Sequence, residues 1–195
     1  AVREKLNDAF KIADRGFYTM YNGQDLRGWK GLVANPVKRR LLSADTLALL
    51  QVKADEVMRS GWEAKGEELH FTGHGDNLCS VKDYQDFEMY VDWKIEKEGD
   101  AGIYLRGSPQ VQIWDTALTK VGAQVGSGGL YNNQINPRIP LKVADNPVEE
   151  WNTFRIIMKG ERVTVYLNGE LVVDKAILEN YWDRKIPIFL KDAIE

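Results

Sequence analysis

A switch to two-residue periodicity in the middle of the chain constrains the fold most. From Phe87 to Glu96, apolar side chains alternate with polar ones, as in a β-strand that buries one face. The apolar positions are Phe87, Met89, Val91, Trp93 and Ile95. Shorter alternating stretches follow at residues 103–106, 110–114, 154–158, 163–167 and 171–173, and Asn168-Gly169 predicts a tight hairpin turn. Because no helical pattern separates these stretches, we expect a mainly β fold, an antiparallel two-sheet sandwich.

Helical periodicity is confined to the region before the alternating stretches. Residues 3–15 predict a short N-terminal helix, and residues 44–59 predict an inserted helix with Ser43 as its N-cap. The side chains expected on the buried face of the inserted helix are Leu47, Leu50, Ala54 and Val57. We therefore expect a helical lead-in over residues 1–16 and one β-sandwich domain over residues 17–195.

Composition excludes several classes of function. The 195 residues carry a net charge of -3 at pH 7, so no strong positive field favours binding of nucleic acid. No apolar run reaches the roughly 18 residues that a membrane span requires. The single cysteine, Cys79, allows no internal disulfide, and the two histidines, His70 and His74, poorly supply a zinc site or a Ser-His-Asp triad. We expect no cofactor, while a bound divalent cation such as Ca²⁺ is left open.

Three successive predicted strands would place their polar side chains on one sheet face. These side chains are Glu88, Tyr90, Asp92, Lys94, Tyr104, Arg106, Gln110, Gln112 and Trp114. Aromatic rings among amides and charges are typical of a sugar site, where rings pack on C–H faces and polar groups bind hydroxyls. The alternative is a polar face that is simply solvated, as in many antiparallel sheets.

The carboxylates on this face do not form an obvious glycosidase pair. Glu88 and Asp92 lie four residues apart on one strand, which separates their backbones by roughly 13 Å. Glycosidase carboxyl groups lie roughly 5–9.5 Å apart. Asp115, which ends the third strand, is the nearest candidate partner. The glycine-rich stretch 122–129 matches no phosphate-binding spacing, and we expect a flexible loop that either covers a ligand or only connects strands.

Motifs spread over most of the chain resemble those of the 3-keto-disaccharide hydrolase domain family. They are Tyr21–Trp29, Tyr84–Glu88, Val91–Ile95, Gly102–Gly107, Gln110–Asp115, Glu150–Thr153 and Leu167–Gly169. The resemblance implies a concanavalin A-like jelly-roll and an extracytoplasmic bacterial protein that degrades glycosides oxidised at the sugar 3-position. Relative to that family, the domain is expected to lack a final C-terminal segment. A carbohydrate is the expected ligand, and no oligomeric state is predicted.

Chemistry at a 3-keto sugar needs one base and one electrophile. The ketone acidifies the neighbouring C2 proton, so a base can remove it, the C1 substituent can leave, and water can add back. The candidate bases are Glu88, Asp92 and Asp115, with Lys94 and Arg106 as electrophilic partners. The candidate substrate-binding residues are Tyr90, Tyr104, Gln110, Gln112, Trp114 and Tyr131. Two other interpretations stay open: a non-catalytic carbohydrate-binding module on the same face, and a structural domain without a small ligand.

Overall fold

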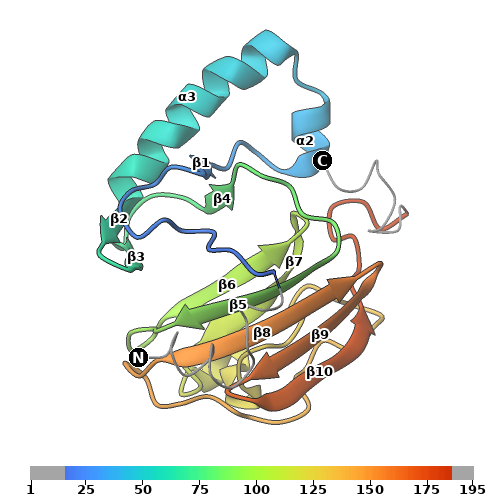
Figure 1. The fold of residues 1–195 in the computed structure, drawn as a ribbon. Helices are drawn as coiled ribbons and strands as arrows, with labels where there is room; N and C mark the ends of the chain where they lie inside the picture. The colour runs from blue at the N-terminus through green and yellow to red at the C-terminus, as the bar shows by residue number, and fades with distance from the viewer. Residues whose placement is uncertain (1–15, 186–195) are drawn as a thin grey trace. The chain divides into compact units, whose positions relative to one another are not determined.

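The computed structural model describes residues 16–185 (Figure 1), so the helix predicted over residues 3–15 lies outside the described residues. The described chain forms two compact units. The first contains residues 16–34 and 41–83, and the second contains residues 35–40 and 84–185. The predicted boundary between a lead-in and a single domain stays a prediction.

The first unit is built on one long helix. Helix α3 runs over Ala44–Gly61, and Ser43 caps it by accepting a hydrogen bond from the Thr46 N–H at 3.2 Å. The predicted inserted helix is therefore confirmed. The strands of this unit form the antiparallel pairs β1 (Trp29–Gly31) with β4 (Leu78–Ser80), and β2 (Trp62–Lys65) with β3 (Glu68–Phe71).

The predicted buried face of α3 is wrong at one position. Val57 is 42% exposed, whereas Met58 is only 3% exposed. Residues three and four positions beyond Ala54 both fit a helical stripe, so periodicity alone could not choose between them. Polar contacts hold the helix as well: the Gln51 amide donates to the Gly31 carbonyl at 2.8 Å, and the Asp55 carboxylate accepts from the Gly31 N–H at 2.8 Å.

Gly31 makes the closest approach of strand β1 to helix α3. A Cβ atom on Gly31 would lie 2.0 Å from the Ala54 carbonyl oxygen, so we expect Gly31→Ala to destabilise the first unit by about 1–3 kcal/mol. Native-state amide hydrogen exchange in α3 measures this loss. In Gly66→Ala, nothing surrounds the added methyl and only left-handed backbone strain acts, so a loss of about 1 kcal/mol is expected. Equal losses in the two variants would show that the contact with α3 contributes nothing.

The second unit is an antiparallel β-sandwich, which confirms the predicted fold class (Figure 1). One sheet has the order β10-β9-β8-β5, and the other pairs β6 with β7. Its elements are α2 (Pro36–Arg40), β5 (Phe87–Trp93), β6 (Asp100–Leu105), β7 (Ser108–Trp114), the 3-10 helices η2 (Thr119–Val121) and η3 (Ala123–Val125), β8 (Asn152–Lys159), β9 (Arg162–Leu167) and β10 (Glu170–Ile177). Asn168 and Gly169 have φ angles of 52° and 87°, as the predicted hairpin turn between β9 and β10 requires.

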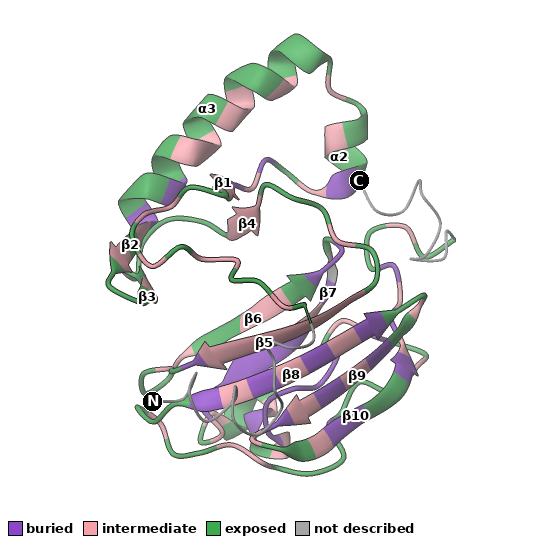
Figure 2. Ribbon diagram, viewed as in Figure 1, coloured by how far each residue is buried: buried purple, intermediate pink, exposed green. Residues whose placement is uncertain are grey.

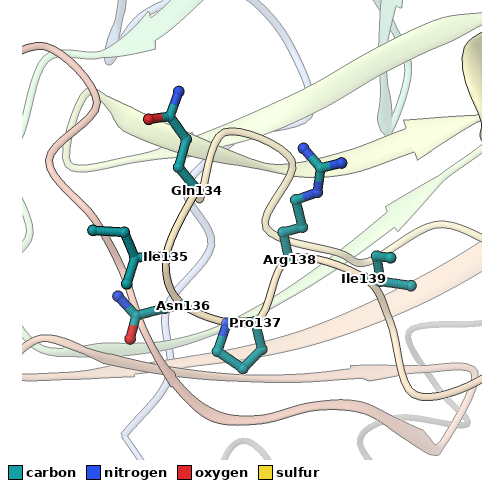
Figure 3. A pocket seen from close by; sticks show the side chains of 6 residues that line it. All are labelled: Gln134, Ile135, Asn136, Pro137, Arg138 and Ile139. Atoms are coloured by element: carbon teal, nitrogen blue, oxygen red, sulfur yellow. The ribbon is translucent and has the colours of Figure 1, made fainter.

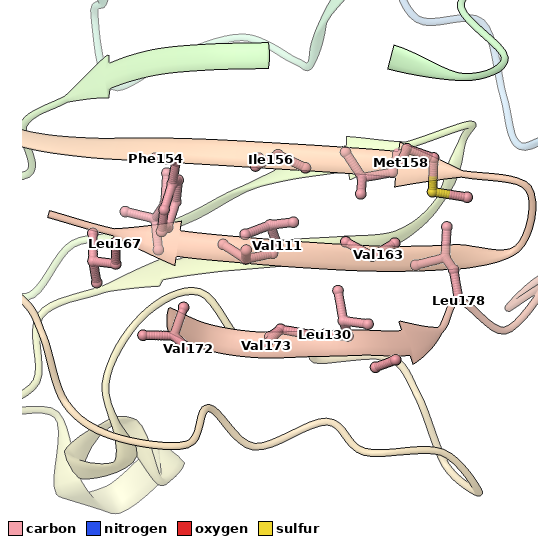
Figure 4. Close-up of a cluster of buried hydrophobic side chains, with 14 of the residues drawn as sticks. Val111, Leu130, Phe154, Ile156, Met158, Val163, Leu167, Val172, Val173 and Leu178 are labelled. Atoms are coloured by element: carbon pink, nitrogen blue, oxygen red, sulfur yellow. The ribbon is translucent and has the colours of Figure 1, made fainter. Parts of the chain in front are cut away.

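Both sheets of the second unit contribute to one apolar core (Figures 2 and 4). Val111 and Leu130 come from the β6–β7 side, while Phe154, Ile156 and Val165 come from the four-stranded sheet, and all five are fully buried. The alternation predicted the core face correctly. The other side chains predicted on the apolar faces of these strands are buried in this core or packed against it: Phe87, Met89, Val91, Trp93, Ile103, Leu105 and Ile113.

The glycine-rich stretch is packed in its second half, so the prediction of a flexible loop is wrong there. Gln112 donates its N–H to the Gly129 carbonyl at 2.9 Å, and Val111 forms a β-bridge with Leu130. Ser127 is fully buried and donates its N–H to the Asp145 carboxylate at 3.0 Å. The segment over residues 128–131 thus runs antiparallel to β7 and extends the β6–β7 sheet through a single β-bridge.

Candidate functional site

The predicted polar face divides into two faces that lie on opposite sides of the sandwich. Strand β5 pairs with β8, not with β6 or β7. Both sheets turn their apolar side chains into the same core, so the polar side chains of β5 and those of β7 point outward in opposite directions. The prediction of one shared face is therefore wrong, because alternation gives the face of a strand but not its partner.

Glu88 lies within a charged network on the outer face of the four-stranded sheet. Its carboxylate accepts hydrogen bonds from Arg155 Nε at 2.7 Å and from the Tyr90 hydroxyl at 3.1 Å. The Arg155 guanidinium also lies 5.2 Å from the centre of the Tyr166 ring, on the neighbouring strand. These contacts hold Glu88 and Tyr90 in place between β5, β8 and β9, as a structural network would.

Asp92 and Lys94 follow Glu88 along β5 and beyond it. The Thr153 hydroxyl donates to the Asp92 carboxylate at 2.5 Å; burial raises the pKa of Asp92, and this hydrogen bond opposes the rise. The Lys94 ammonium lies 4.9 Å from the centre of the Trp151 ring, a cation–π contact. Neither side chain shares a face with the aromatic residues of β6 and β7.

Arg106 is buried in the turn between β6 and β7, and this corrects its prediction as an exposed electrophile. Its backbone φ angle is 51°, and its side chain is 1% exposed. The guanidinium donates from Nε to the Gln85 carbonyl at 2.9 Å and from Nη2 to the Asp86 carboxylate at 3.1 Å. Arg106 therefore anchors the chain before β5 to the β6–β7 turn.

Asp115 is also buried and serves as a cap for backbone groups. Its two carboxylate oxygens accept the N–H groups of Glu98 and Ala117, each at 2.9 Å. These hydrogen bonds lower the pKa of Asp115. The sequence predicts Asp115 as a candidate base and carboxylate partner; in the structure both of its oxygens are engaged by the loops that flank β6 and β7.

The outer face of β6 and β7 instead gathers a connected row of polar groups. The Gln110 amide donates to Gln112 Oε1 at 2.6 Å, and the Gln112 amide donates to Asp100 Oδ1 at 2.6 Å. Gln112 is 2% exposed, whereas Asp100 is exposed. Gly102 leaves the room for this row, since a Cβ there would lie 2.6 Å from Gln110 Oε1. The two amides thus orient one solvent-accessible carboxylate.

Exposed tyrosines flank this row, and the predicted stacking ring is buried beneath one of them. Tyr104 is 45% and Tyr131 46% exposed, whereas Trp114 is 7% exposed. Trp114 donates from its indole to the Gly126 carbonyl at 2.9 Å, and its ring meets that of Tyr131 edge-on with centroids 5.8 Å apart. Trp114 is therefore a support for Tyr131 and not an open platform, because the chain at Gly126 covers it.

Tyr104 has a second aromatic neighbourhood in the segment after β10. Partial burial raises the pKa of Tyr104, and Tyr181 and Asp100 act in the same direction. Tyr181 and Trp182 pack edge-on with centroids 4.8 Å apart, and the Trp182 indole donates to the Gly107 carbonyl at 2.7 Å. The site therefore has a neutral phenol, a carboxylate and several exposed rings.

Sequence reasoning missed Asp100, Tyr181 and Trp182. A signal for Asp100 was present, because Asp100, Gly102 and Tyr104 continue the same two-residue alternation. No comparable signal exists for Tyr181 and Trp182, which lie in an irregular segment.

The loop over residues 134–139 surrounds a hollow of about 410 Å³ (Figure 3). Its lining is Gln134, Ile135, Asn136, Pro137, Arg138 and Ile139. All of these residues come from the one loop, and Ile135 is 90% exposed. Because a single exposed loop forms the lining, this hollow is a weaker site candidate than the β6–β7 face. Within residues 16–185, no helix has the length and apolar character of a membrane span, and no group of three metal-ligating side chains is present.

Acid stability should depend on the capping carboxylate Asp115. Its pKa is lowered in the folded state, so its stabilisation is complete above the ordinary aspartate pKa of about 4 and is lost as pH falls below that value. We expect the melting temperature of the wild type to drop steeply below about pH 4. Asp115→Asn should melt lower at pH 7 and show a shallower drop, measured by calorimetry between about pH 3 and pH 7. Parallel curves would contradict the capping role.

Comparisons with known proteins identify a family and a shared fold. Residues 16–194 match the family described as the 3-keto-alpha-glucoside-1,2-lyase-like domain. A curated relative named 3-keto-disaccharide hydrolase, from Bacteroides thetaiotaomicron, is 23% identical over 192 residues, covering 86% of this chain and 61% of the relative. The chain thus spans less than two thirds of that relative.

Solved structures show a similar fold in proteins described as candidate glycosyl hydrolases from Parabacteroides distasonis. One has a TM-score of 0.61 at 19% identity, covering 94% of this chain and 78% of the other. A second has a TM-score of 0.57 at 22% identity, covering 83% of this chain and 65% of the other. At these identities the likeness concerns the fold alone.

Proposed function

This chain belongs to the 3-keto-alpha-glucoside-1,2-lyase-like domain family, and from this premise we propose that it degrades 3-keto-glycosides on the outer face of β6 and β7. The observation that carries the proposal is the row Gln110–Gln112–Asp100, which presents one accessible carboxylate on a face that also carries exposed tyrosines. A location outside the cytoplasm, expected from the family resemblance, is part of this proposal.

Asp100 is the base in the proposed reaction. Its Oδ1 accepts the hydrogen bond from Gln112, which orients the carboxylate, while its exposed side can take the C2 proton of a 3-keto sugar. The electron pair of the C–H bond forms an enolate, and the C1–oxygen bond then breaks. The leaving alkoxide takes the proton that Asp100 holds, which returns Asp100 to the carboxylate, and water then adds its hydroxyl to C1 and its remaining proton to C2.

Tyr104 is the proposed partner of the developing enolate: it lies four residues from Asp100 along β6, roughly 13 Å between backbones, and its long side chain interacts electrostatically with the Asp100 carboxylate. The phenol is protonated at neutral pH, as in an ordinary tyrosine, and partial burial raises its pKa further, so the hydroxyl can donate a hydrogen bond to the oxygen at C3. This role replaces the one predicted for Lys94 and Arg106. Gln110, at the end of the row, offers an amide for hydroxyl groups, and Tyr131, beside the row, offers a ring for a sugar face.

A non-catalytic carbohydrate-binding module is the second candidate. Its support is that Asp100 is the one carboxylate in the described row, whereas ordinary glycosidases use two. A module would bind sugars through the same tyrosines without forming product. Assaying 3-keto and unoxidised glycosides for both binding and product separates the two functions.

Tyr104→Ala should weaken binding of a 3-keto glycoside by about tenfold in titration calorimetry, a loss that one aromatic contact provides. The matched control is Tyr166→Ala, which removes a ring from the outer face of the opposite sheet. We expect the affinity of this control to stay within about twofold of the wild type. Should Tyr166→Ala weaken binding while Tyr104→Ala does not, the sugar site would lie on the four-stranded sheet.

A further inference from the structure

The Glu179 carboxylate fills a nest of backbone donors at residues 134–136, in the loop that Figure 3 shows. It accepts the N–H groups of Gln134, Ile135 and Asn136 at 2.9, 2.7 and 2.6 Å. Arg184 donates to its second oxygen at 2.6 Å, and the Glu179 side chain is only 10% exposed. Three successive donors and a cation form a complete anion site, here occupied by the chain's own carboxylate.

Asn132 connects this nest to strand β7. Its carbonyl accepts a hydrogen bond from Arg184 Nη2 at 3.2 Å, and its side-chain oxygen accepts the Gln110 N–H at 3.1 Å. The preceding residue, Tyr131, donates its N–H to the Gln110 carbonyl at 3.2 Å. The backbone that carries Tyr131 is thus fixed on one side by β7 and on the other by the Glu179–Arg184 pair.

Arg184 also connects the nest to the aromatic residue Tyr181. Its guanidinium lies 5.4 Å from the centre of the Tyr181 ring, and Tyr181 interacts electrostatically with Tyr104. The Glu179–Arg184 ion pair therefore acts on two aromatic residues. Arg184 contacts the carbonyl of Asn132, the residue after Tyr131, and it also contacts the ring of Tyr181.

We infer that Glu179 is a positioning residue for the sugar site: its carboxylate orders segment 132–136 and holds Arg184, and so positions Tyr131 and Tyr181. This inference rests on the proposed function of the β6–β7 face. Charge is the essential property, because a glutamine amide would turn N–H groups toward donors that need an acceptor.

The decisive variants are Glu179→Gln and Glu179→Ala. Both variants should speed amide hydrogen exchange over residues 132–136 and raise KM for a 3-keto glycoside about tenfold. The kcat should stay within about twofold of the wild type, because aromatic residues that are not the base act on binding. Acetate should restore KM and exchange in Glu179→Ala by entering the vacated nest. The matched control is Glu170→Gln, which breaks an exposed ion pair with Lys142 and should change none of these quantities.

Each outcome separates the positioning role from the proposed function. If the wild type turns over the sugar and Glu179→Gln keeps its KM, Glu179 does not position the site. If the Glu179 variants only reduce the amount of folded protein, and acetate does not change KM in Glu179→Ala, the role of Glu179 is structural and the inference is also overturned. A third outcome is that the wild type neither binds nor converts any glycoside, while the Glu179 variants speed amide hydrogen exchange over residues 132–136 as expected. In that case Glu179 orders this segment, and the proposed function is wrong.

Discussion

Asp100→Asn should lower kcat on a 3-keto glycoside by about two to four orders of magnitude, with ligand affinity nearly unchanged. The amide cannot take the C2 proton, yet it can keep the hydrogen bond from Gln112 through its carbonyl oxygen. Single-turnover product formation measures the chemical step, and calorimetry with the same sugar measures binding.

Three carboxylate variants provide the comparison. Glu88→Gln and Asp92→Asn change the opposite sheet and should keep kcat within about threefold of the wild type. Asp115→Asn weakens two hydrogen bonds from backbone N–H groups, so we expect it to lower the melting temperature while kcat of the folded protein changes little. If Asp100→Asn retains full turnover while Glu88→Gln or Asp92→Asn abolishes it, the proposed site is on the wrong face.

Trp114→Ala should destabilise the second unit by about 3–5 kcal/mol, as expected when a buried indole is removed. The ring is 7% exposed, and its N–H donates to Gly126. The variant would leave a cavity under Tyr131 and an unpaired carbonyl. Urea denaturation followed by far-ultraviolet circular dichroism gives the free energy of unfolding.

Trp182→Ala is the matched tryptophan control for this loss. Its ring is 38% exposed and makes a single hydrogen bond, to the Gly107 carbonyl, so the expected destabilisation is about 1 kcal/mol. A stable Trp114→Ala protein with reduced sugar affinity would instead support the stacking role that the sequence predicted for Trp114.

The inside and outside of most strands could be predicted from sequence because alternation reports burial directly. Phe87 to Trp93 and Phe154 to Met158 turn the expected side chains into the core. The Asn168-Gly169 turn was equally local, since both residues favour positive φ. The β1–β4 and β2–β3 pairs are short, and their sequences carry too few alternations to indicate a strand.

The candidate site could be predicted only in part, because it depends on which strands are neighbours. Tyr104, Gln110, Gln112 and Tyr131 do lie on or beside one face, as expected. Glu88 did not join them, since the pairing of β5 with β8 is a long-range choice that no local pattern encodes. The same limit applies to Glu179, because three of its hydrogen bonds come from backbone N–H groups, which any residue type supplies, and its ion-pair partner Arg184 lies in an irregular segment.

The pairing of β5 with β8 also determines when this sandwich can form during synthesis. Phe87 pairs with Met158 and Trp93 with Asn152, so β5 has no partner strand until the chain has been made past β8. Closing such a long intervening segment carries an entropic penalty that local hairpins avoid. The β6–β7 hairpin can form before β8 has been made, whereas β5 must wait for β8 with its apolar face uncovered. We therefore expect assembly of the four-stranded sheet to limit the folding rate, and the nascent β5 to be the segment that most needs protection from aggregation.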